Sequence, residues 1–304
     1  MTGAFKILPL AAVLLAWNAG AQDLARQARA SMAAGDPLAA ARICERGMLA
    51  GPDSEELETI YLSLPAETLA ARWAERYERA GRSSDVRELI ALGRELSDFD
   101  PRRKTGGPKL ALELLARAIR TAPENPWAYF EYGRALRTNG SPEEMFAAWD
   151  RALALQPDDA LRLRIYTWIG KQRSALAQPE LAGTAFRAAH EINRKPALRQ
   201  ARWAWEYFAF LRTGSGGEEA RAVLAEILEW DPGFVPAVLE RARLSAQRQE
   251  WTAGIRDARY VLRYAAGNLE LERGAHALLA RAYSVLNQEP QARRHQAWIE
   301  AHPR

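Results

Sequence analysis

Apolar residues recur every three or four positions along most of this chain, and this spacing predicts amphipathic helices separated by short turns. The clearest stretch runs from Pro126 to Pro157. Its two halves are separated by Asn139-Gly140, a pair that ends helices. The apolar positions are Tyr129, Tyr132, Leu136, Met145, Trp149 and Ala152. We therefore predict a hairpin of two helices in this stretch.

The same order of large and small residues recurs along the chain. Further units contain Leu24, Leu89, Leu163, Ala201, Val238 and Leu279 in their first helices. Residues 53–82 fit only a truncated helical pair, and the register is less regular over 53–107, where an insertion follows Phe99. Self-similarity at a fixed period is the signature of a repeat protein. We expect roughly eight helical hairpins.

This order resembles the tetratricopeptide (TPR) repeat, which has an aromatic residue, an apolar-small pair and a large apolar residue, followed by alanine, an aromatic residue, alanine and proline. The resemblance implies an all-α fold, an α-solenoid of about eight hairpins wound as a right-handed superhelix with a concave groove. Small residues such as Gly133 and Gly170 would let paired helices approach closely. Trp149 and Phe186 would fill the gap from the opposite helix.

The turns carry matching signals. Ser141 and Glu144 have the spacing of a capping box at the start of a helix. Pro142 and Pro179 suit first-turn positions. The acidic pairs at 143–144 and 218–219 also lie in first turns, where carboxylates complement the helix dipole. Helix stability therefore accounts for these pairs better than acid–base catalysis does.

The first 21 residues have the pattern of a secretory signal peptide. Lys6 is followed by a short apolar run over 7–17 and by the small residues Ala19-Gly20-Ala21. We predict cleavage after Ala21, leaving residues 22–304 as a repeat array in the periplasm or outside a bacterial cell. An uncleaved signal that tethers the chain to the inner membrane is the alternative. No later stretch reaches the length of an integral membrane span.

The candidate binding surface is basic. The chain has a formal net charge of +4, and nearly all its positive charge is arginine. In TPR proteins the first helix of each repeat lines the inner groove, and the residue after the small one points into it. Those positions here are Arg94, Arg134, Lys171, Arg243 and Arg281, and the same stripe adds Trp127, Phe130, Arg137, Arg164, Trp205 and Arg212. An arginine-rich composition, which scatters arginine everywhere, is the competing explanation.

A basic groove with aromatic side chains would bind an anionic partner. Arginine grips carboxylates through two hydrogen bonds, and aromatic rings add contact area. An acidic protein or peptide segment and an anionic, uronic-acid-type polysaccharide both fit. The resemblance implies an interaction scaffold of the cell envelope that assists assembly, secretion or polysaccharide export, and a carbohydrate-binding module is the alternative. Nucleic acid is not expected for an exported chain of modest charge.

Catalytic and metal signatures are weak, so we expect no enzyme activity, cofactor or metal. No two of the four histidines have metal-ligand spacing along a helix, and Cys44, the single cysteine, is expected in the core. The basic segment 101–104 is expected to be a solvated loop. The aromatic residues of 203–210 are either core or a ligand pocket centred on Trp205.

Overall fold

The computed structural model describes residues 23–50, 55–82, 85–97, 107–214, 217–265 and 267–303. All regular structure within these ranges is helical, which confirms the predicted all-α solenoid of helical hairpins. The predicted signal peptide (1–21) and the basic segment 101–104 lie outside the described residues. In the ranges given above, no helix combines the length and the apolar character needed to cross a bilayer.

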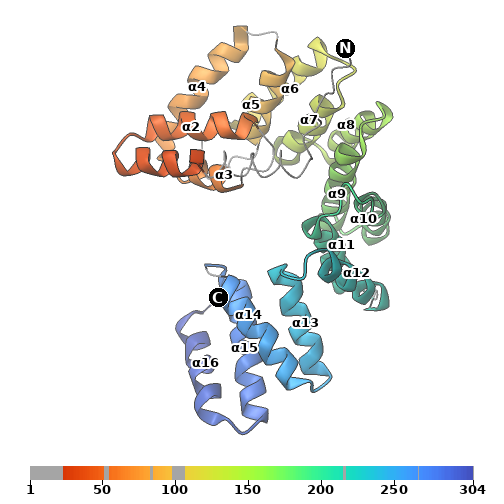
Figure 1. Cartoon of the computed structure of the whole chain (residues 1–304). Coiled ribbons are helices and arrows are strands. Elements are labelled where there is room, and N and C mark those ends of the chain that lie inside the picture. Colours follow the sequence, from red (N-terminus) through yellow and green to blue (C-terminus); the bar gives the residue numbers. More distant parts are fainter. Residues whose placement is uncertain are drawn as a thin grey trace, which may run out of the picture. The chain divides into compact units, whose positions relative to one another are not determined.

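Most consecutive helices pack against each other in pairs (Figure 1). The first described helix covers residues 23–33 and is followed by α2 (Pro37–Ala50), α3 (Glu55–Leu62) and α4 (Ala66–Arg82), and both α3 and α4 contact α2. The later helices form the pairs α5 (Val86–Ser97) with α6 (Gly107–Thr121), α7 (Pro126–Asn139) with α8 (Pro142–Ala154), α9 (Asp159–Ala175) with α10 (Pro179–Asn193), α11 (Ala201–Thr213) with α12 (Gly217–Trp230), α13 (Val235–Gln247) with α14 (Trp251–Tyr264), and α15 (Leu269–Val285) with α16 (Glu289–Ala301). These bounds match the predicted hairpins. The stretch predicted to be truncated contains α3, a helix of 8 residues.

The chain divides into two compact units, Met1–Pro157 and Asp158–Arg304. The first unit ends after α8 and the second begins with α9. Within each unit, neighbouring helices bury alanine, leucine and aromatic side chains against one another. Each hairpin therefore completes its core with residues from the next, as repeat proteins do.

In two of the hairpins, a glycine lets the two paired helices approach each other closely, as predicted. A Cβ atom on Gly133 of α7 would lie 2.4 Å from Nε1 of Trp149 in α8, and one on Gly170 would lie 2.8 Å from the ring of Phe186. Trp149 is completely buried, and its Nε1 donates a hydrogen bond to the carbonyl oxygen of Phe130 at 3.0 Å. The small residue on one helix and the large residue on the other therefore form a single packing unit.

The first unit contains a buried ion pair in its core. Arg72 of α4 donates to Glu45 of α2 through Nη2 at 2.6 Å and through Nε at 3.2 Å, and both side chains are 7% exposed. The hydroxyl of Tyr61 donates to the same carboxylate at 3.2 Å. The neighbouring Cys44 is fully buried, which confirms the predicted core position, and burial raises the pKa of its thiol to about 11. The thiol is therefore neutral and unreactive near pH 7.

Ser141 begins α8 with the predicted capping box. Its hydroxyl accepts from the Glu144 backbone N–H at 3.1 Å, and the Glu144 carboxylate accepts from the Ser141 N–H at 3.2 Å. Replacing Ser141 with alanine is expected to remove about 1 kcal/mol of helix stability. Hydrogen exchange in the first turn of α8 should then speed up roughly fivefold. Ser284→Ala, on the exposed face of α15, is the matched control, and an equal effect there would contradict the capping role.

Candidate functional site

The predicted groove residues of the first unit lie on α5 and α7. Arg94 and Trp127 are half-buried, and Arg137 is exposed. Phe130 is only 2% exposed, so the expectation that its ring forms an open aromatic platform is wrong. The physical reason is that α7 packs against α5 as well as against α6 and α8, and these helices enclose more of α7 than one hairpin would. Trp127 meets the Phe130 ring edge-on at 6.0 Å.

Arg134 is held by an acid on its own helix. Its Nη1 donates to Glu131 Oε2 at 2.8 Å, and the two side chains are 11% and 2% exposed. The guanidinium also lies 5.9 Å from the centre of the Phe130 ring. Because a buried carboxylate needs a cation or several hydrogen-bond donors, Arg134 neutralises Glu131. Its charge is therefore not fully available to a partner.

Acidic residues also meet the basic stripe in the second unit, and here they join successive hairpins. Lys171 of α9 donates to Glu206 of α11 at 2.6 Å. Arg212 of α11 donates to Glu240 of α13 at 2.9 Å, and Arg243 contacts the same Glu240 oxygen. The Glu240 side chain is 11% exposed. These contacts link the first helices of three neighbouring hairpins through side chains.

These glutamates change the interpretation of the stripe. Glu131 and Glu240 each stand three residues before a groove arginine, one turn back on the same helix face. The signal in the sequence was the Glu-x-x-Arg spacing at 131–134 and 240–243, which predicts an ion pair along one helix. Glutamate side chains of the same chain therefore neutralise much of the predicted basic stripe. Arg164 is half-buried on α9.

The aromatic residues of α11 lie mainly in the core. Tyr207 and Phe208 are 2% and 4% exposed and belong to the apolar cluster shared by α10, α11 and α12. Trp205 is half-buried, 4.9 Å from the ring centre of Phe208 and 5.8 Å from that of Phe234. Packing between hairpins therefore accounts for most of this cluster, and Trp205 keeps a partly exposed edge.

A hollow of about 860 Å³ lies between α13, α15 and the end of the chain. It brings together Arg243 and Arg281 of the predicted stripe and adds Arg273, which the stripe did not include. Leu269, 58% exposed, contributes an apolar side chain to its lining. The hollow thus combines three arginines and one glutamate, Glu270, with an apolar edge. Its excess of positive charge suits a small acidic segment better than an uncharged ligand.

The arginines of the hollow are held in different ways. Gly274 leaves room for Arg243, since a Cβ atom there would lie 2.9 Å from an Nη2 nitrogen of Arg243. Arg273 donates through Nη1 to the carbonyl oxygen of His302. The Arg281 guanidinium lies 5.9 Å from the centre of the Trp251 ring, a cation–π contact that orients it without neutralising it. Arg281 is exposed, so its charge can reach a ligand.

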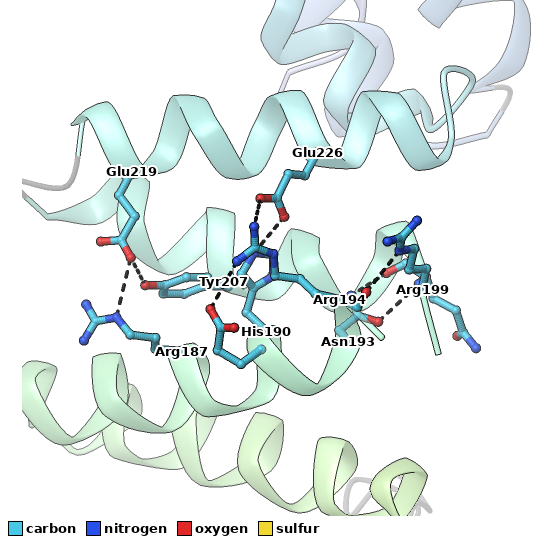
Figure 2. Close-up of polar contacts among 10 residues, drawn as sticks. Arg187, His190, Asn193, Arg194, Arg199, Tyr207, Glu219 and Glu226 are labelled. Carbon is cyan, nitrogen blue, oxygen red and sulfur yellow. Dashed lines mark hydrogen bonds and ion pairs between the residues drawn. The ribbon is translucent and has the colours of Figure 1, made fainter. Parts of the chain in front are cut away.

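A second polar cluster joins α10, α11 and α12, and Figure 2 shows its side chains converging from these helices. The Tyr207 hydroxyl donates to Glu219, and Arg187 Nε lies 3.6 Å from the same carboxylate. Two turns along α12, the Glu226 carboxylate lies 3.1 Å from both His190 Nε2 and Arg194 Nη2. Hydrogen bonding to Glu219 adds to the effect of burial, and together they raise the pKa of Tyr207 to about 12.

This cluster fastens three helices rather than opening to a substrate. His190 is 6% exposed and packs against the rings of Tyr207 and Trp230, at 5.3 Å and 6.1 Å between ring centres. Burial lowers the pKa of its imidazole, and the Glu226 carboxylate opposes that shift. The imidazole therefore sits as a neutral packing group beside a carboxylate near pH 7.

Comparisons with solved structures identify the fold of this chain. No family model and no curated protein matches the sequence. The structure of PilF from Pseudomonas aeruginosa matches with a TM-score of 0.55 at 15% identity, over 71% of this chain and 92% of that chain. The C-terminal part of a TPR repeat-containing protein from Cytophaga hutchinsonii matches with a TM-score of 0.54 at 16% identity, over 76% and 91% of the two chains. The chain has a TPR-like fold.

The structure of PilW, a widely conserved type IV pilus biogenesis factor, also matches this TPR-like chain, with a TM-score of 0.50 at 16% identity over 70% of this chain and 93% of PilW. Identities this low establish the arrangement of helices and leave the function of the chain to its own surface. Within the part of the chain that the structure describes, no cluster of three or more metal-ligating side chains is found.

Proposed function

We propose that this chain is a protein–protein interaction scaffold that binds an acidic segment of its partner in the hollow between α13 and α15. The observation that carries this proposal is the meeting of Arg243, Arg273 and Arg281 around one cavity of about 860 Å³. The TPR-like fold supports it, since stacked hairpins offer an extended surface for another chain. The hollow replaces the longer basic groove because acids neutralise much of that stripe.

Each part of the hollow has a role in this proposal. A carboxylate of the partner accepts hydrogen bonds from the Arg281 fork, which Trp251 holds in place. A second acidic group reaches Arg273 by displacing the carbonyl oxygen of His302. An apolar side chain of the same segment packs on Leu269. The segment that fits best therefore alternates acidic and apolar residues.

The sequence pattern of residues 1–21 supports a location of the partner in the cell envelope. The predicted signal peptide over 1–21 would deliver residues 22–304 to the periplasm or outside the cell, or tether them to the inner membrane if it is retained. PilF and PilW share the TPR-like fold, and PilW is described as a type IV pilus biogenesis factor. By analogy with that role, the scaffold assists assembly or secretion of an envelope structure.

Photo-crosslinking in intact cells tests this proposal. A photoreactive amino acid at Ala277, an exposed residue in the hollow, should trap the partner. Reversing Arg273 and Arg281 to glutamate should reduce the trapped product more than tenfold, because each charge-assisted hydrogen bond contributes about 1.5–3 kcal/mol. Arg293→Glu is the matched control, since Arg293 is 82% exposed on α16 and does not line the hollow.

The outcomes separate the alternatives. A protease-sensitive product that is lost with the double reversal and kept with Arg293→Glu supports a protein partner in the hollow. A product resistant to protease, with the mass heterogeneity of a polysaccharide, contradicts the protein scaffold and favours carbohydrate binding. Equal trapping by the double variant contradicts the hollow as the binding site.

A further inference from the structure

Two histidines from different helices meet in the last hairpin. Nδ1 of His276 in α15 lies 2.8 Å from Nδ1 of His295 in α16, with the ring centres 4.9 Å apart. The two residues are 19 positions apart in the chain, so spacing along a single helix could not reveal the pair. It is the hairpin that brings them together.

The contact between the two nitrogens limits how much positive charge the two imidazole rings can carry together. At 2.8 Å, one Nδ1 donates its hydrogen and the other accepts it through its lone pair. An imidazolium carries hydrogen on both nitrogens and has no lone pair to offer. If both rings were protonated, two N–H groups and two positive charges would face each other, and the contact would become repulsive. The docked hairpin therefore accepts at most one of the two protons.

The pair belongs to a stack of rings that forms much of the contact between α15 and α16. His276 lies parallel to Trp298 at 4.0 Å, His295 lies nearly parallel to Tyr283 at 5.7 Å, and Trp298 continues to His302 at 4.1 Å. Among the described residues of α16, Ala292 is the buried one. With so little other burial, the rings carry a large share of the docking of α16.

The surrounding charges offer little compensation for added protons. Glu272 of α15 and His302 beside α16 face His276. Arg294 of α16 and Arg259 of α14 face His295, and Arg259 also donates to the Tyr283 hydroxyl at 2.6 Å. One carboxylate thus stands against two arginines and a third histidine. Protonation of the pair would add positive charge to an environment that is already positive.

We propose that His276 and His295 form a proton-sensitive latch that holds α16 against α15 near neutral pH and releases it as the pH falls. Release of α16 would change the lining of the hollow, because His302 and Pro303, which directly follow α16, contribute to that lining. The latch rests on contacts between α15 and α16 and does not depend on the proposed partner.

The sign of the effect follows from proton linkage. Burial lowers the pKa of His276, and the nearby His295 adds to this; burial also lowers the pKa of His295, and Arg294 adds to that. An undocked α16 exposes both rings, whose pKa then returns to about 6.5. The undocked state therefore binds more protons than the docked state below that pH. Docking is fully stable above about pH 6.5 and weakens as the pH falls through and below it.

Hydrogen–deuterium exchange of residues 289–301 in the full chain tests the latch between pH 7.5 and 5.0, with rates corrected for the intrinsic pH dependence of exchange. Carboxylates stay charged over this range because their usual pKa is about 4. We expect protection of α16 to fall about tenfold for each unit by which the pH is lowered, over the range in which the docked state holds one proton fewer than the undocked state. His295→Asn keeps a polar nitrogen near the Nδ1 position but does not titrate, so its pH response should be much flatter.

The control and the second variant make each result decisive. His190→Asn, in the α10–α12 cluster, should leave the pH response of α16 unchanged. If His295→Asn unfolds the last hairpin, as judged by helical content, His276→Asn replaces it with the same expectation. The latch is overturned if α16 keeps its protection at pH 5.0, or if a folded His295→Asn or His276→Asn protein loses protection as steeply as the native chain.

Discussion

Trp149→Ala is expected to lower the free energy of unfolding of the first unit by about 3–5 kcal/mol, the range for deleting a buried aromatic side chain. Trp149 is completely buried between α7 and α8, so its removal opens a cavity against Gly133. It also leaves the Phe130 carbonyl without its indole donor. Urea unfolding with hydrogen exchange of α7 and α8 would measure the loss.

A glycine substitution separates packing from the hydrogen bond. Gly133→Ala should destabilise the native chain, because the new Cβ would lie 2.4 Å from Trp149 Nε1. In the Trp149→Ala background the same change should cost little, since the opposing ring is gone and alanine favours helix. Additive effects of the two substitutions would contradict a shared packing unit.

The second large effect concerns the buried ion pair of the first unit. Arg72→Met should cost about 3–5 kcal/mol, because it removes the guanidinium group that neutralises the buried Glu45 carboxylate. The double change Glu45→Leu and Arg72→Met removes both charges and should recover most of that loss. Chemical denaturation of the two variants gives the comparison.

A surface pair provides the control for this prediction. Arg162→Met breaks the contact of Arg162 with Asp159, whose side chains are 42% and 35% exposed. Exposed pairs contribute about 0–1 kcal/mol, so little change is expected there. If Arg72→Met is as mild as Arg162→Met, the buried pair does not stabilise α2 against α4.

The helical hairpins could be predicted because their signals are local. Glycine facing a large aromatic residue fixed the pairing of α7 with α8, and Ser141 with Glu144 fixed the start of α8. Each signal spans fewer than about 20 residues and depends on the geometry of one helix or one turn. The resemblance to TPR proteins then ordered the hairpins in series.

The candidate site was harder to predict because it depends on how hairpins stack. Lys171 meets Glu206 across 35 positions, and Arg212 meets Glu240 across 28. Whether such side chains meet depends on the rise and rotation between hairpins, which the sequence of a single helix does not contain. Phe130 was misplaced for the same reason, since its burial depends on packing beyond its own helix, and α7 contacts three other helices.

Glu240 has a consequence for how strongly salt would weaken binding at the hollow. Its carboxylate already occupies Arg243, so an incoming acid must compete with a resident one. Added salt screens the resident pair and the incoming pair alike, and the two effects partly cancel. Affinity should therefore decline with ionic strength as though two arginines were engaged, although three line the hollow.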